Sequence, residues 1–138
     1  MNVSEVMTPR CKTCGQDDSI ADAAKAMATS EIGVLPIENG DKLVGVLTDR
    51  DIVTRSVALG RDADSTKVQD VMSGQVFYCF DDQSADEVAE NMGKMRVRRL
   101  PVVNRKKELV GMVSLGDLAS RGAADAAGTA LSRVSAPG

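Results

Sequence analysis

The chain has 138 residues, 43% of them hydrophobic and 27% charged, a composition typical of a folded globular protein of one or two small domains. Seventeen basic residues nearly balance twenty acidic ones, and the net charge of −3 gives no general reason to bind nucleic acid or an anionic membrane. Histidine is absent, which excludes Ser/His and Cys/His nucleophilic pairs and most catalytic zinc sites. We therefore expect a protein that is not an enzyme.

The aromatic residues, the apolar runs and the cysteines exclude further classes of protein. The three aromatic residues all lie between Phe77 and Phe80, which does not suit a surface that stacks nucleic-acid bases. No apolar run reaches the length of a membrane span, and the first twenty residues show no signal-peptide pattern. An odd number of cysteines, three, favours reduced thiols. The sequence predicts a cytoplasmic protein that binds neither nucleic acid nor membranes.

In the first half of the chain, a short extended segment near residues 11–14 precedes an amphipathic helix that begins at Ile20. Apolar residues recur there at the i, i+3, i+4, i+7 spacing of a helix that buries one face. Apolar runs at 33–37 and 42–47 predict two strands, and a second helix follows them. The polar segment 61–67 is the predicted linker.

The second half repeats this order. An extended segment near residues 76–80 leads to an amphipathic helix that begins at Ala85, and strands are predicted at 99–103 and 108–113 before another helix. The tail, residues 123–138, is rich in alanine and glycine. It predicts a marginal helix that forms only if it packs against the rest of the protein.

The two halves align when the chain is shifted by 65 residues. Val-Ser-Glu-Val-Met at 3–7 then matches Val-Gln-Asp-Val-Met at 68–72, and the two Leu-Pro pairs coincide. One added residue in the second half brings the Leu-Val-Gly triplets into register. We therefore predict an α/β (α+β) fold of two β-α-β-β-α repeats, residues 1–60 and 68–122, related by a pseudo-twofold axis.

One segment in each half leads from a strand into a helix: Gly-Val-Leu-Thr-Asp-Arg-Asp at 45–51 and Gly-Met-Val-Ser-Leu-Gly-Asp at 111–117. Thr48 with Asp51, like Ser114 with Asp117, has the spacing of a helix capping box. The same groups suit a nucleotide, because free N–H groups and a hydroxyl bind phosphate, and a carboxylate accepts hydrogen bonds from ribose. The spacing leaves both roles open.

Basic residues near these segments differ between the halves. Arg50 lies between two aspartates and either neutralises a phosphate or pairs with its neighbours, whereas the second half has glycine at this place. Arg-Val-Arg-Arg at 96–99 replaces Glu-Ile-Gly-Val at 31–34. Because strand residues alternate faces, Arg98 and Arg99 are expected to point to opposite faces, one of them supplying charge to a ligand.

Cys11 and Cys14 form a Cys-x-x-Cys pair, which supplies half of a tetrahedral zinc site. With no histidine and only Cys79 left, the other ligands would have to be carboxylates or come from a second chain. Cys14 aligns with Cys79 in the repeat, which favours small packed side chains at both positions. We predict no metal site, and a metal- or redox-responsive protein is the alternative.

The order and spacing of these motifs resemble a tandem pair of CBS domains, named after cystathionine β-synthase. The resemblance spans residues 3 to 122 and is carried by Val-Met-Thr-Pro at 6–9, Val-Met-Ser-Gly at 71–74, the Leu-Pro strands and the duplicated Gly-x-x-Thr/Ser-x-x-Asp motif. The first half is similar to stand-alone bacterial CBS-pair proteins. The resemblance implies sheets packed together with helices outside, and two clefts that hold AMP, ATP or NAD without a required cofactor.

The resemblance also implies roles for single residues. Asp51 and Asp117 would accept hydrogen bonds from ribose, and Thr48 and Ser114 would face the phosphate. The residues implied around adenine are Thr13, Val34, Pro36, Ile37, Tyr78, Val97, Pro101 and Val102.

In kinase γ-subunits of the family, basic residues just before the Leu-Pro-type strand contact phosphate. Arg98 and Arg99 occupy that place here, whereas Gly33 and Val34 depart from it, so we expect the two clefts to differ in affinity. The resemblance further implies a homodimer that regulates a separate, unknown protein in response to an adenosine nucleotide. A structural dimer with empty clefts is a further alternative.

Overall fold

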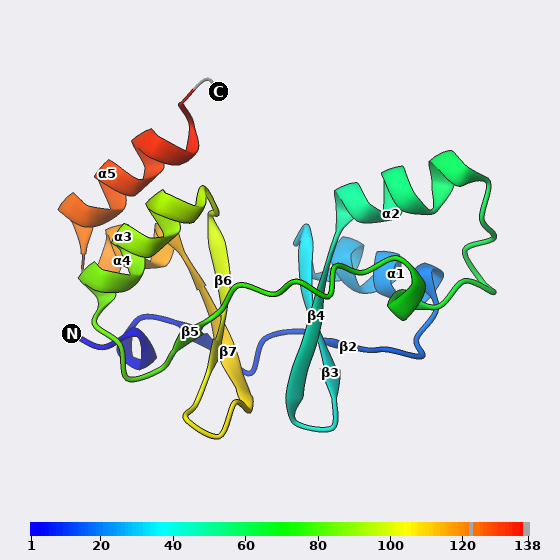
Figure 1. Cartoon of the computed structure of the whole chain (residues 1–138), viewed down its shortest axis with the longest axis horizontal. Helices are drawn as coiled ribbons and strands as arrows, with labels where there is room; N and C mark the ends of the chain where they lie inside the picture. Colours follow the sequence, from blue (N-terminus) through cyan, green and yellow to red (C-terminus); the bar gives the residue numbers. More distant parts are fainter. Residues whose placement is uncertain (122, 137–138) are drawn as a thin grey trace. The chain divides into compact units, whose positions relative to one another are not determined.

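Figure 1 shows a computed structural model of the chain, which describes residues 1–121 and 123–136. Contacts divide the chain into two compact units. Lys12–Val76 forms one, called here the first-repeat unit, and Met1–Cys11 together with Phe77–Gly138 forms the other, the second-repeat unit. Each contains the strand, helix, strand, strand, helix order that the sequence predicts.

The first-repeat unit is built on a three-stranded sheet of order β2-β3-β4. Strand β2 is Cys14–Gly15, β3 is Val34–Asn39 and β4 is Lys42–Thr48. Strands β2 and β3 are parallel, and β3 and β4 form an antiparallel hairpin. The helices are α1, Ile20–Ser30, and α2, Asp49–Arg55.

The second-repeat unit has a four-stranded sheet of order β1-β7-β6-β5. Its strands are β1 (Thr8–Pro9), β5 (Cys79–Phe80), β6 (Arg99–Val103) and β7 (Leu109–Ser114). Its helices are α3 (Ala85–Met95), α4 (Leu115–Arg121) and α5 (Ala124–Val134). Short 3-10 helices lie at Val3–Glu5 in this unit and at Val57–Leu59 and Val68–Asp70 in the other.

The first helix of each repeat begins at a serine, as its sequence predicts. Ser19 Oγ accepts a hydrogen bond from the Asp22 N–H at 3.0 Å, and Ser84 Oγ accepts one from the Glu87 N–H at 3.1 Å. These bonds satisfy N–H groups that a helix cannot pair internally. Each helix then buries an apolar face in the core of its own unit.

The opening segment of each sequence repeat packs with the other unit. Val3 and Val6 are fully buried in the core of the second-repeat unit, where Thr8 pairs with Met112 of β7. The matching residues after the linker, from Val68 onward, join the core of the first-repeat unit. Contacts therefore group residues 1–11 with a part of the chain that is distant in sequence.

A glycine at the start of each Gly-x-x-Thr/Ser motif allows the opening segment of the other repeat to pack against this strand. A Cβ at Gly111 would lie 2.6 Å from the Thr8 carbonyl oxygen. A Cβ at Gly45 would lie 3.0 Å from the Ser73 carbonyl oxygen and 2.6 Å from Met72 Sδ. Only a residue without a side chain permits this close approach of two backbones.

The alanine- and glycine-rich tail forms helix α5, which packs on α3 and α4 (Figure 1). Ala127 and Ala130 are buried in the core of the second-repeat unit. At the crossing, a Cβ on Gly93 of α3 would lie 3.0 Å from Ala130 Cα, so this glycine allows the two helices to approach closely. Among the described helices, none combines the length and apolar character that crossing a membrane requires.

Candidate functional site

The Thr/Ser-x-x-Asp segments form capping boxes in both repeats. Thr48 Oγ1 accepts from the Asp51 N–H at 3.0 Å, and Asp51 Oδ2 accepts from the Thr48 N–H at 3.0 Å. Ser114 and Asp117 exchange the same two bonds at the same distances. The capping role is therefore present in the structure. It uses one oxygen of each carboxylate, and a carboxylate offers about four lone-pair positions, so capping leaves acceptor capacity for a ligand.

In the second repeat, Arg98, Arg99 and Ser114 line one cavity of about 360 Å³. The other residues that line it are Leu115, Gly116, Ala119, Ala124, Ala127, Gly128 and Leu131. Among the described residues of the chain, no acidic side chain lines this cavity. Two arginines thus line a space that has no acidic residue among its described lining residues, an arrangement that favours an anionic ligand.

Arg98 and Arg99 both line this cavity, and the expectation that their side chains point to opposite faces stays a prediction. Strict alternation holds only within a strand, and β6 begins at Arg99, so Arg98 lies just outside it. Arg96 ends α3 with a φ of 57°, and the chain turns there before the strand. The Arg98 carbonyl oxygen accepts from the Leu115 N–H at 3.0 Å, which places this backbone beside the start of α4.

The corresponding place in the first repeat has the opposite charge. The Gly33 carbonyl oxygen accepts from the Asp49 N–H at 2.9 Å, matching the bond between Arg98 and Leu115 in the second repeat. A Cβ at Gly33 would lie 2.8 Å from Asp49 Oδ2, so a carboxylate occupies this position. Arg50 is exposed, and its backbone N–H donates to Asp49 Oδ1 at 2.8 Å.

The residues expected around adenine differ in accessibility. Ile37 and Val102 are fully buried, each in the core of its unit, so their side chains are already packed against protein. The two prolines, Pro36 and Pro101, are also buried, whereas Thr13, Val34 and Val97 are half-buried and Tyr78 is exposed. Among the described residues, the cavity brings together only Arg98, Arg99 and Ser114 of the predicted set.

Helix α5 contributes cavity residues that the sequence interpretation missed. Ala124, Ala127, Gly128 and Leu131 form one wall of the cavity. Their spacing is i, i+3, i+4, i+7, so they share one helix face. This spacing was visible in the tail, but it predicts a packed helix face and gives no sign that the face borders a ligand site.

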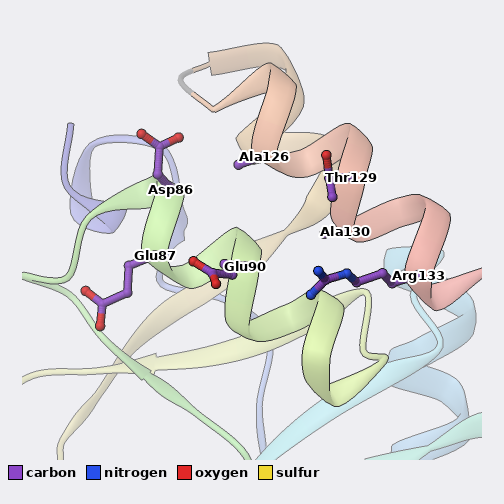
Figure 2. A pocket seen from close by; sticks show the side chains of 7 residues that line it. All are labelled: Asp86, Glu87, Glu90, Ala126, Thr129, Ala130 and Arg133. Carbon is purple, nitrogen blue, oxygen red and sulfur yellow. The ribbon is translucent and has the colours of Figure 1, made fainter.

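A second face of α5 borders a groove of about 470 Å³ against α3 (Figure 2). Figure 2 shows three carboxylates carried by α3 and the Arg133 side chain extending from α5. The residues lining this groove are Asp86, Glu87, Glu90, Ala126, Thr129, Ala130 and Arg133. Lys94 pairs with Glu90 at 3.2 Å between exposed side chains. No group of three or more potential metal ligands occurs among the described residues.

Two of the three cysteines, Cys14 and Cys79, are buried in the cores of their units. Burial raises the pKa of the Cys79 thiol from 9.0 to about 12, and its Sγ donates to the Pro101 carbonyl oxygen at 3.8 Å. Burial also raises the pKa of Cys14. Cys11 is half-buried and belongs to the second-repeat unit, whereas Cys14 belongs to the first-repeat unit. Thiols held protonated are weak nucleophiles and metal ligands, and the metal- or redox-responsive alternative stays a prediction.

Comparison with known proteins gives a consistent assignment. The family model described as "CBS domain" matches residues 3–58 and 68–123. The Bacillus subtilis protein YlbB is 38% identical over 136 residues, which cover 96% of this chain and 90% of YlbB.

Two solved structures illustrate the structural similarity. A crystal structure of Hypoxic Response Protein I with two coordinated zinc ions is 31% identical, with a TM-score of 0.80 over 88% of this chain and 98% of that one. The crystal structure of CBSX2 in complex with AMP is 23% identical, with a TM-score of 0.75 over 86% of this chain and 93% of that one. On the family match, the duplicated motif and the shared fold, this chain belongs to the CBS domain family and carries two copies of the domain.

Proposed function

We propose that this protein is a non-catalytic regulatory module that binds an adenosine nucleotide in the second repeat and signals its presence to a partner protein. The observation that carries the proposal is the cavity lined by Arg98, Arg99 and Ser114, which has no carboxylate in its described wall. Guanidinium groups bind phosphate oxygens through paired, charge-assisted hydrogen bonds. The phosphate end of the nucleotide is therefore assigned to this cavity.

The size of the cavity and a structural neighbour of the chain support the same class of ligand. The cavity volume of about 360 Å³ lies within the range of small-molecule sites. A structural neighbour, CBSX2, was crystallised with AMP. In the proposal, Asp117 accepts hydrogen bonds from the ribose with the oxygen that the cap does not use.

The first repeat is proposed to bind phosphate poorly or not at all. Gly33 and Val34 stand where the second repeat has its two arginines, and the Asp49 carboxylate lies against Gly33. A carboxylate repels a phosphate at short range. The proposal is thus one phosphate-bearing ligand per chain.

The test is a comparison of AMP and adenosine by titration calorimetry. Replacing both arginines (Arg98→Ala with Arg99→Ala) is expected to weaken AMP binding by about tenfold or more, because each charge-assisted hydrogen bond contributes about 1.5–3 kcal/mol. Adenosine affinity is expected to stay within about twofold, since it lacks the phosphate. Arg50→Ala in the first repeat is the matched control and should leave both affinities unchanged.

Two outcomes would contradict the proposal. An equal loss for AMP and adenosine would show that the arginines maintain the cavity and do not recognise phosphate. A wild-type chain that binds none of AMP, ATP and NAD would leave a structural dimer without a nucleotide as the better description.

A further inference from the structure

Helix α5 forms one wall of the cavity to which the phosphate is assigned. Four of the ten lining residues lie on it, and the wall outside this helix includes Arg98, Arg99 and Ser114. The residues that α5 presents are small apart from Leu131, and a Cβ on Gly128 would meet no atom within 4 Å. The cavity therefore exists because a helix with a small-residue face is docked at this place.

Helix α5 is docked by apolar packing, since Ala127 and Ala130 of the helix and Ala123 before it are buried in the core of the second-repeat unit. The helix has 11 residues, and its N-cap, Ala123, makes no side-chain hydrogen bond. A helix of this length is marginal in water without tertiary contacts. It approaches α3 closely at Gly93, and just beyond its end Arg98 Nη2 donates to Ser135 Oγ at 3.4 Å between exposed residues.

We propose that α5 is a flap coupled to the ligand: a nucleotide phosphate bound between Arg98 and the Gly128 face of α5 holds the helix docked. This inference rests on the proposed nucleotide site. A ligand that contacts both walls binds the docked state more tightly than the undocked state, so its binding shifts the helix toward docking. The coupling is reciprocal, so loss of docking must weaken the binding of the ligand.

The coupling gives the nucleotide a structural effect that a partner protein can detect. When α5 leaves, it uncovers surface of α3 and α4 that it buries in the docked state, including Gly93. The first repeat offers an internal comparison, because Ala28 of α1 matches Gly93 and is exposed. Nucleotide concentration would therefore set the fraction of chains in which the second repeat presents such an uncovered helical face.

The first test displaces α5 without touching the arginines. In Gly93→Leu, the new side chain meets the Ala130 backbone, whereas Ala28→Leu adds a leucine at the matching exposed position of the first repeat. Hydrogen exchange of peptides covering 124–134 reports docking, and calorimetry with AMP reports binding. We expect faster exchange in Gly93→Leu with AMP affinity about tenfold weaker, and neither change in Ala28→Leu.

A second variant fills the cavity from the side of α5 and keeps the test valid if Gly93→Leu fails to fold. Gly128→Leu extends into open space, so α5 should stay protected from exchange while AMP affinity falls. Ser132→Leu is the control, because this exposed residue of α5 lies outside the cavity wall. In the wild-type chain, saturating AMP should slow exchange of residues 124–134.

The outcomes separate the flap from the nucleotide site. If the wild-type chain binds AMP but exchange of α5 does not slow, or if a folded Gly93→Leu binds AMP as tightly as the wild type, the flap is wrong and the site stands. Tighter AMP binding by Gly93→Leu would also overturn it, since α5 would then compete with the ligand. Absence of AMP binding by the wild-type chain would overturn both.

Discussion

At the scale of single residues, Asp51 and Asp117 show how one motif can carry two roles. Each carboxylate closes a capping box with the hydroxyl three residues earlier, and the geometry is the same in both repeats. The surroundings differ, because the second repeat has two arginines that line a cavity together with Ser114, whereas the first repeat has Gly33 and Val34 at the places of the arginines. A matched pair of substitutions can therefore separate capping from ligand binding within one chain.

We expect Asp117→Ala and Asp51→Ala each to lower the free energy of unfolding by about 1 kcal/mol, the usual cost of losing a cap. Only Asp117→Ala should also weaken AMP and adenosine together, by about tenfold or more, since both ligands carry the ribose. Urea unfolding and calorimetry on the same samples measure the two effects. Unchanged affinity in Asp117→Ala would leave this residue with the capping role alone.

At the scale of elements, the antiparallel pairing of β1 with β7 depends on a glycine. Gly111→Ala would place a Cβ 2.6 Å from the Thr8 carbonyl oxygen, so the two backbones must separate. We expect the free energy of unfolding to fall by about 1–3 kcal/mol, the typical cost of overpacking. Gly74→Ala is the control, because a Cβ there meets nothing within 4 Å. Urea titration measures the free energy of unfolding of both variants. Equal values would show that the pairing of β1 contributes little to stability.

The sequence predicted elements whose signals are local. The serines before α1 and α3, the apolar spacing within those helices and the alternating strands all act over a few residues, and the structure confirms the repeat order. Strand β6 has the predicted bounds, Arg99–Val103, whereas β3 extends two residues beyond its predicted end.

Features that depend on distant residues could not be predicted in this way. The pairing of Thr8 with Met112 leaves no local signal except a glycine, which many turns also use. The α5 wall was missed because a face of small residues looks the same whether it borders a core or a cavity. Arg98 precedes the strand, so the alternation of strand residues does not fix the direction of its side chain. Strand boundaries are the part of a sequence pattern that is least well defined.

At the scale of the whole molecule, the two repeats present different helical faces. Helix α5 packs on α3 and α4, whereas the first-repeat unit leaves apolar side chains exposed after β4, at 57% for Val53, 65% for Val57 and 64% for Leu59. Exposed apolar residues that lie close together mark interaction surfaces. We expect the proposed homodimer to use this face of the first repeat in both copies, in an isologous contact.

Placing carboxylates on this face should separate the subunits. In the chain carrying both Val53→Glu and Val57→Glu, we expect sedimentation velocity to show a monomer, because a twofold contact brings the new charges of both copies together. Phe77→Glu is the control, since Phe77 is also an exposed apolar residue but lies in the second-repeat unit. If Phe77→Glu gives a monomer while the chain with Val53→Glu and Val57→Glu stays dimeric, the dimer interface lies in the second repeat.

The placement of residues 1–11 also affects how the protein is made. Translation at about 5–20 residues per second adds the sixty-five residues of the first-repeat unit as one continuous stretch, which can fold while synthesis continues. Val3 and Val6 are synthesised before the first-repeat unit, yet the core that they join also contains residues of β7, at Leu109–Ser114, and of α4 and α5. A transcript truncated before β7 would therefore yield a chain with a folded first repeat and an unprotected apolar segment around Val3 and Val6, a combination that proteolytic quality control can recognise.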